Sequence, residues 1–248
     1  HAAIFDGATT IFQITDDPDA AAVTPSGASI IATMKPALAM LLDLLPETAR
    51  AMQAGRVLPP APSAADPLPV EFLLHSLSEA MPANAVLVEE APSHRPAMQK
   101  FMPMRGQDSF YTMASGGLGY SLPAAVGMAL GRPATRTVCL IGDGSAMYGI
   151  QALWSAAHYG AGVLFVILSN GGYAIMDRLA ERHGLAAPWP SFNVDVAGLA
   201  RAQGCTARRI SEPDELLRTL DEVVPDLAMR QEPLLLDVVI APTSTFAP

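Results

Sequence analysis

Cysteine is scarce in this chain, which excludes the disulfide-rich and zinc-bound classes of small protein. The 248 residues include two cysteines, Cys139 and Cys205, too few for a disulfide framework or a cysteine-based zinc site. Cys139 lies in the apolar run 138–141, so we expect a small core residue rather than a reactive thiol. Cysteines that form no framework fit a reducing compartment, and we predict a cytoplasmic location.

Positive charge and long apolar runs are lacking as well. The chain has 15 Lys and Arg against 24 Asp and Glu, which gives a net charge of −9. An acidic chain repels polyphosphate backbones, so we expect no nucleic-acid partner. Glycine, proline or charged residues interrupt the longest apolar runs well before the roughly 20 residues that span a membrane, so we expect no membrane span.

The first position lacks a methionine, and a strand-like stretch at 9–15 follows the opening HAAIFDG almost at once. We therefore expect a fragment, a processed product or the ordered part of a longer chain. Residues 1–48 indicate the end of an α/β domain. Residues 49–69 are rich in Pro and Ala with little periodicity, which is typical of a linker.

Apolar strands alternate with helices from residue 70 to the end of the chain. Because the strands are apolar without interruption, they indicate a parallel sheet covered by helices on both faces. The predicted strands are 84–90, 109–115, 135–143, 162–170, 205–210 and 233–241. The predicted helices are 70–81, 118–131, 145–160, 172–184, 195–204 and 213–224.

Two polar side chains stand where consecutive apolar strands end. Asp143 ends the strand 135–143, and Asn170 ends the next strand, 162–170. Consecutive strands of a βαβ unit usually lie near each other, so their carboxyl ends, where open parallel sheets bind ligands, do too. A carboxylate, an amide oxygen and a carbonyl exposed by the following glycines suit Mg²⁺, which takes further oxygens from water and phosphates.

A phosphate site is expected beside this cation site. Gly144 and Ser145 open the following helix, and the unpaired N–H groups at a helix N-terminus favour phosphate. The residues therefore indicate a magnesium-bridged diphosphate. In the alternative interpretation Asp143 merely caps the helix and Asn170 merely sits in a turn; their matched positions at two strand ends favour the ligand site.

These residues resemble a known family. Gly-Asp-Gly at 142–144, followed one helix and one strand later by Asn170, is similar to the thiamin diphosphate (ThDP) motif. The chain resembles ThDP-dependent 2-oxo acid decarboxylases, in particular the benzoylformate decarboxylase type, over nearly its whole length. The stretches that carry the likeness are SGGLGYSLPAAVGMAL (115–130), IGDGSAMYGIQALWSAAHYG (141–160) and VILSNGGYAIM (166–176).

The resemblance implies a fold and a set of metal ligands. An α/β ThDP-binding fold, a parallel sheet flanked by helices on both faces, would occupy residues 70–248. The C-terminal part of a Rossmann-like middle domain would precede it at 1–48. Mg²⁺ would be bound by the side chains of Asp143 and Asn170 and by the backbone carbonyl of Gly172.

The resemblance also assigns cofactor contacts at the diphosphate end. Gly144 and Ser145 would hold the diphosphate, and Ser93 would join them. Tyr173 would pack beside it.

Further positions are assigned to the organic part of the cofactor and to the substrate. The backbone of Gly116 would bond to the aminopyrimidine, and Leu118 would be the apolar wedge that bends the cofactor. Met176 and Leu179 would face the substrate. His1 is a candidate for the active-site histidine that benzoylformate decarboxylases carry shortly before this region.

The activity implied by the resemblance is the ThDP- and Mg²⁺-dependent, non-oxidative decarboxylation of a benzoylformate-like 2-oxo acid to an aldehyde and CO₂. A homodimer or homotetramer is expected. The family's N-terminal pyrimidine-binding domain has no counterpart here, so the expected partners include that domain or a neighbouring subunit. The alternatives are a carboligase or lyase of the acetolactate synthase or benzaldehyde lyase type, and an inactive cofactor-binding fragment. A nicotinamide enzyme is disfavoured, because GGLGYS at 116–121 lacks the Gly-x-Gly-x-x-Gly spacing.

Several conspicuous side chains have plainer interpretations. Glu89 and Glu90 are expected to be polar rim or helix-start residues rather than catalytic acids. His94 is expected at the surface of a helix start. Trp154 and Tyr159 have the spacing of core residues on one helix and are expected to pack in the interior.

Overall fold

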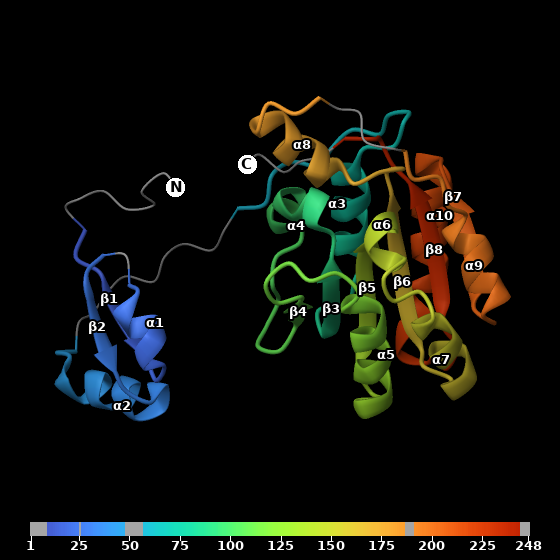
Figure 1. Cartoon of the computed structure of the whole chain (residues 1–248). Coiled ribbons are helices and arrows are strands. Elements are labelled where there is room, and N and C mark those ends of the chain that lie inside the picture. The colour runs from blue at the N-terminus through green and yellow to red at the C-terminus, as the bar shows by residue number, and fades with distance from the viewer. Residues whose placement is uncertain (1–8, 25, 48–56, 187–190, 244–248) are drawn as a thin grey trace. The chain divides into compact units, whose positions relative to one another are not determined.

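The computed structural model describes residues 9–24, 26–47, 57–186 and 191–243. The chain forms two compact units, residues 1–56 and 57–248 (Figure 1). The division falls inside the predicted linker 49–69. The end of that segment belongs to the second unit, because Leu68 is buried there and its carbonyl accepts a hydrogen bond from the N–H of Ala241 at 2.9 Å.

The first unit is a small parallel α/β element. Its strands are β1 (Phe12–Thr15) and β2 (Ala28–Ile31), and its helices are α1 (Pro18–Ala22) and α2 (Met34–Leu44). The two strands pair in parallel, as a strand–helix–strand crossover requires. No described residue of this unit is buried.

The second unit is built on a parallel sheet of six strands in the order β4-β3-β5-β6-β8-β7. All of its strand pairs are parallel, so the predicted fold class is confirmed. The strands are β3 (Ala85–Glu90), β4 (Phe110–Thr112), β5 (Arg136–Gly142), β6 (Val163–Ser169), β7 (Thr206–Ile210) and β8 (Leu234–Val239).

Helices cover both faces of this sheet because successive apolar side chains of each strand point to opposite sides. In β5, Val138 and Leu140 belong to one buried cluster, whereas Cys139 and Ile141 belong to the other. The first cluster includes side chains of α3 (Val70–Ala80), α4 (Arg95–Phe101) and α10 (Pro213–Val223). The second includes side chains of α5 (Ser121–Gly131), α7 (Ala152–Tyr159) and α9 (Val196–Ala202).

The continuous helix predicted at 145–160 is wrong. The chain instead forms a single turn, α6 (Asp143–Ala146), and resumes as α7 after a series of tight turns. The break contains Gly149, whose low helix propensity favours turns over a helix. A Cβ atom at this position would lie 3.2 Å from the Gly119 carbonyl oxygen, so the close packing of the two segments favours glycine there.

The core positions predicted for Trp154 and Tyr159 are also wrong. Their exposed fractions are 52% and 61%, because they lie on the outer side of α7 while Leu153 and Ala156 point inward. Trp154 stacks on His158 with ring centroids 4.6 Å apart. Cys139 is buried, as predicted. No helix among the described residues is long and apolar enough to cross a membrane.

Candidate functional site

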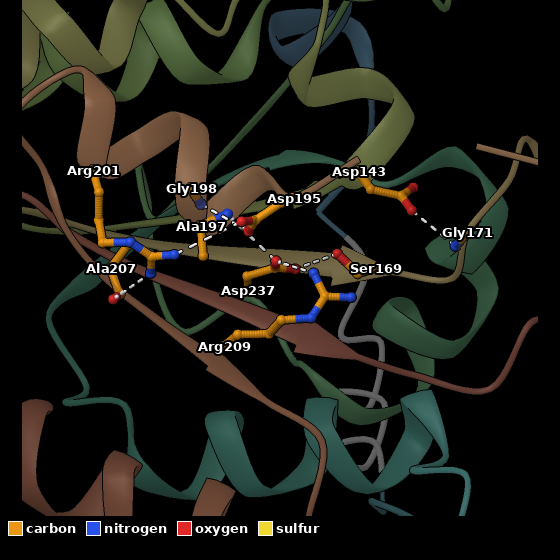
Figure 2. Close-up of polar contacts among 10 residues, drawn as sticks. All are labelled: Asp143, Ser169, Gly171, Asp195, Ala197, Gly198, Arg201, Ala207, Arg209 and Asp237. Atoms are coloured by element: carbon orange, nitrogen blue, oxygen red, sulfur yellow. Dashed lines mark hydrogen bonds and ion pairs between the residues drawn. The ribbon is translucent and has the colours of Figure 1, made fainter. Parts of the chain in front are cut away.

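Asp143 and Asn170 lie at the carboxyl ends of neighbouring strands. β5 and β6 pair directly, with Gly142 opposite Leu168. The Asp143 carboxylate accepts the N–H of Gly171 through Oδ2 at 2.8 Å, a contact drawn in Figure 2. The two predicted strand ends therefore meet, as the βαβ argument requires.

The carboxylate and the amide keep oxygen atoms for a ligand. Asp143 Oδ1 accepts the N–H of Gly144 at 2.7 Å, and the two carboxylate oxygens together offer about four lone-pair sites, so acceptor capacity remains for a ligand. Asn170 Oδ1 accepts the N–H of Gly172 at 3.3 Å. Both side chains are buried at the base of a cavity.

This cavity, of about 280 Å³, gathers nearly all the predicted site residues. Leu179 does not line it, although Met176, one turn earlier on α8 (Ala174–Arg182), does. His1 lies outside the described residues. The predicted residues that line the cavity are Ser93, Gly116, Leu118, Asp143, Gly144, Ser145, Asn170, Gly172, Tyr173 and Met176.

At two positions that line the cavity, the surrounding structure or the backbone conformation requires a glycine. A Cβ atom on Gly144 would lie 2.5 Å from Tyr173 Cε1, and the Tyr173 hydroxyl donates to the Gly144 carbonyl at 3.4 Å. Tyr173 thus packs directly on the turn after β5. Gly116 has a φ of +73°, which a residue with a side chain rarely adopts.

The helix-dipole argument for the phosphate site needs correction. α6 spans four residues, Asp143–Ala146, too short for a sizeable macrodipole. In addition, the Gly144 N–H donates to the Asp143 carboxylate and is not unpaired.

Burial shapes the electrostatics of the site. It raises the pKa of Asp143 to about 6, against the opposing effect of the hydrogen bonds from Gly171 and Gly144. Burial also lowers the pKa of His94 to about 4. Burial therefore disfavours charge at the site, and a bound cation would lower the pKa of Asp143 again.

His94 is not the surface residue that the sequence indicates. It ends the 3₁₀ turn η1 (Pro92–His94), is 2% exposed and lines the cavity. The turn is held inside because the neighbouring Ser93 Oγ accepts the N–H of Ile175, at the start of α8, at 3.1 Å. A contact between residues this distant in the sequence leaves no local signal.

Glu89 and Glu90 are not rim residues either; both are fully buried. Glu90 accepts the N–H of Gly119 through Oε1 and that of Ser121 through Oε2, each at 2.7 Å. It therefore caps the start of α5 from a neighbouring strand and holds the segment that carries Leu118. Glu90 is thus a strand residue whose side chain caps a helix distant in sequence, and not a helix-start residue itself.

The partner of Glu89 is a cavity residue that the sequence did not single out. Arg95 lines the cavity, and its Nη2 lies 3.0 Å from Glu89 Oε2. Thr112 donates to the same carboxylate oxygen at 2.7 Å.

A further buried acid, Asp237 in β8, supports the end of β6, just before Asn170 (Figure 2). Its carboxylate accepts the hydroxyl of Ser169 and pairs with Arg209 at 2.7 Å. It also accepts the N–H of Ala197, at the start of α9, at 3.4 Å. An aspartate inside an apolar strand is the signal by which the sequence marks this network.

The donors beside the cavity suit a hard cation that keeps other ligands. Among the described residues, no three His, Cys, Asp or Glu side chains gather as a metal site. The cavity is lined by Asp143, Asn170 and Gly172, and a carboxylate and an amide oxygen are donors that suit Mg²⁺ rather than zinc.

Comparison with known proteins decides the family. Residues 91–238 match the family model "Thiamine pyrophosphate enzyme, C-terminal TPP binding domain". The chain belongs to the thiamine pyrophosphate (ThDP) enzymes. Their C-terminal binding domain thus accounts for most of the second unit.

Within the ThDP enzymes, the chain is similar in sequence and structure to decarboxylases of 2-oxo acids. The chain is 34% identical to a benzoylformate decarboxylase from Pseudomonas aeruginosa over 96% of its own length and 44% of the relative's. A crystal structure of benzoylformate decarboxylase from Polynucleobacter necessarius superposes with a TM-score of 0.87 at 29% identity, covering 98% of this chain and 46% of that one. A ThDP-dependent 4-hydroxybenzoylformate decarboxylase from Rhodococcus jostii RHA1 gives 0.82 at 29% identity, with 97% and 45% covered. The chain therefore spans less than half the length of these relatives.

Proposed function

We propose that this chain supplies the cofactor-binding part of a ThDP- and Mg²⁺-dependent decarboxylase that converts a benzoylformate-like 2-oxo acid to an aldehyde and CO₂. The observation that carries the proposal is the meeting of Asp143 and Asn170 at one cavity, in a chain whose relatives include benzoylformate decarboxylases. When bound, ThDP supplies the electron sink for the charge left by the loss of CO₂.

The chain's own residues bind and orient. Asp143, Asn170 and the Gly172 carbonyl would hold Mg²⁺ against the diphosphate. Ser145 and Ser93, which line the same cavity, would hold the diphosphate itself. Because Ser93 Oγ also accepts the Ile175 N–H, it ties the start of α8 to the diphosphate end of the cavity.

The rest of the lining favours an apolar substrate. Leu118, Met113, Ile175 and Met176 give the cavity an aliphatic wall, which would exclude water and accept an aromatic or branched 2-oxo acid. Arg95 contributes a positively charged side chain to the lining of the cavity, and its ion pair with buried Glu89 holds that side chain in place.

We further propose that the active site is completed outside this chain. The relatives are more than twice as long, and a pyrimidine-binding domain or a neighbouring subunit would provide the remaining cofactor contacts. A homodimer or homotetramer in the cytoplasm is the corresponding assembly.

The test is product analysis with the native protein that contains this chain, given ThDP, Mg²⁺ and benzoylformate. We expect benzaldehyde and CO₂ in equal amounts, and neither product without ThDP. Carbon–carbon bond formation without net aldehyde release would indicate a carboligase instead. ThDP binding without any turnover would indicate a cofactor-binding fragment.

Mg²⁺ affinity is expected to depend on pH through Asp143. The carboxyl has to be ionised to bind a cation, and burial raises its pKa in the metal-free chain to about 6. The sign follows: affinity is constant well above that pH and falls by about tenfold per pH unit below it, since each cation displaces one proton. Calorimetric Mg²⁺ titrations at saturating ThDP across this range measure the dependence; affinity that rises on acidification would contradict it.

A further inference from the structure

His94 is a buried cavity residue to which the proposed cofactor contacts give no role. It reaches the cavity from the turn after β3, whereas Asn170 follows β6. Its Nε2 atom lies 3.3 Å from Asn170 Nδ2. Its Nδ1 atom is buried and has no hydrogen-bond partner among the described residues.

Hydrogen-bond chemistry fixes the roles of the two ring nitrogens. Asn170 Nδ2 is a donor, so the His94 nitrogen that faces it has to be the acceptor. The ring is then neutral, with its proton on Nδ1. This is the tautomer in which Nε2 presents a lone pair to the amide.

The same contact fixes the Asn170 amide. The N–H of Gly172 donates to Asn170 Oδ1 at 3.3 Å, on the other side of the amide from His94. Turning the amide by half a rotation would set Nδ2 against the Gly172 N–H, donor against donor. The Gly172 N–H therefore sets the orientation of the amide, and a His94 ring with an unprotonated Nε2 reinforces it, because Oδ1 would otherwise face a lone pair.

We propose that His94 is a positioning residue for the cation site, holding the Asn170 amide so that Oδ1 rather than Nδ2 serves as the ligand. The inference rests on the proposed function, in which Asn170 Oδ1 binds Mg²⁺. An amide that turns freely presents its oxygen for only part of the time, so an orienting partner strengthens binding. Outer partners of metal ligands typically change metal affinity by about 10–100-fold.

The tautomer is tested first, on the full chain without metal or cofactor, by ¹⁵N NMR of histidine-labelled protein at neutral pH. We expect the His94 signal, assigned by its absence from His94→Gln, to show a proton on Nδ1 and an unprotonated Nε2. A proton on Nε2 would overturn the proposal, because that nitrogen would then face another donor. This readout does not depend on whether the chain binds ThDP.

Mg²⁺ titration at saturating ThDP tests the consequence. His94→Leu is expected to weaken Mg²⁺ binding by about tenfold, whereas His94→Gln, whose amide oxygen can take the place of Nε2, should stay within about threefold of wild type. His158→Leu, at an exposed position on α7, is the control for loss of a histidine. Equal Mg²⁺ affinity of wild type and His94→Leu would overturn the inference and leave the proposed function intact.

An Asn170→Asp background separates orientation from general structural damage. A carboxylate presents an oxygen in either orientation, so His94→Leu should weaken Mg²⁺ binding by less than about twofold there. An equal loss in both backgrounds would show a merely structural role and overturn the proposal. Failure of the wild-type protein to bind Mg²⁺ and ThDP at all would instead count against the proposed function. The ¹⁵N NMR measurement of the His94 tautomer would still show whether Nε2 accepts a hydrogen bond from Asn170.

Discussion

Asp143→Ala is expected to lower the affinity for ThDP in the presence of Mg²⁺ by at least about 100-fold and to abolish decarboxylation. The carboxylate is the one charged ligand of the proposed cation site, and the cation bridges the chain to an anionic diphosphate. Without the Asp143 carboxylate the cation loses a ligand, and the negative charge of the diphosphate is no longer balanced in a buried cavity. Calorimetric titration of ThDP at fixed Mg²⁺ measures the effect.

Asp221→Ala provides the matched control for Asp143→Ala. Asp221 is exposed on α10, so its loss removes the same charge far from the cavity and should leave ThDP affinity unchanged. Thermal unfolding of both variants without Mg²⁺ distinguishes lost binding from lost folding. ThDP affinity within about threefold of wild type in folded Asp143→Ala would refute the cation site at β5.

Gly162→Ala is expected to destabilise the second unit by about 3 kcal/mol or more, which raises the ratio of unfolded to folded protein by about 100-fold or more. A Cβ atom on Gly162 would lie 1.8 Å from the Arg230 carbonyl oxygen and 2.6 Å from its carbon. Both are backbone atoms, so the start of β6 or the 230–231 segment has to move. β6 lies between β5 and β8 in the middle of the sheet.

Gly127→Ala is the opposite case and serves as the control. Gly127 is an exposed residue inside α5, and apart from the adjoining residues and the nearby backbone of its own helix no heavy atom lies within 4 Å of the Cβ position. Alanine there should stabilise by about 0.5–1 kcal/mol through helix propensity alone. Urea unfolding of both variants measures the difference; a Gly162→Ala variant within about 1 kcal/mol of wild type would show that the contact with Arg230 relaxes at little cost.

The meeting of Asp143 and Asn170 was predictable because it depends on one rule of topology. The two residues directly follow consecutive parallel strands, and consecutive strands of a βαβ unit pair; β5 and β6 do so. The apolar, uninterrupted strands likewise predicted a sheet covered on both faces. The local sequence pattern was sufficient to predict these features, because each depends on where a residue lies along its own strand.

Residues whose surroundings come from distant segments were not predictable in this way. His94 is buried because Ser93 binds the start of α8, and Glu90 is buried because it caps α5. The break near Gly149 lies where the chain packs against the Gly119 backbone. Each depends on a tertiary contact that overrides hydrophilicity or helical periodicity.

The central claim is that a cation bound by Asp143 and Asn170 holds ThDP in this cavity. The most direct measurement is a crystal structure of the native protein grown with ThDP and Mn²⁺ in place of Mg²⁺, with anomalous scattering recorded at the manganese edge. We expect one anomalous peak at this cavity, bounded by the Asp143 carboxylate, Asn170 Oδ1 and the Gly172 carbonyl, with the diphosphate on its other side. ThDP bound with no peak there, or a peak held by other residues, would contradict the account.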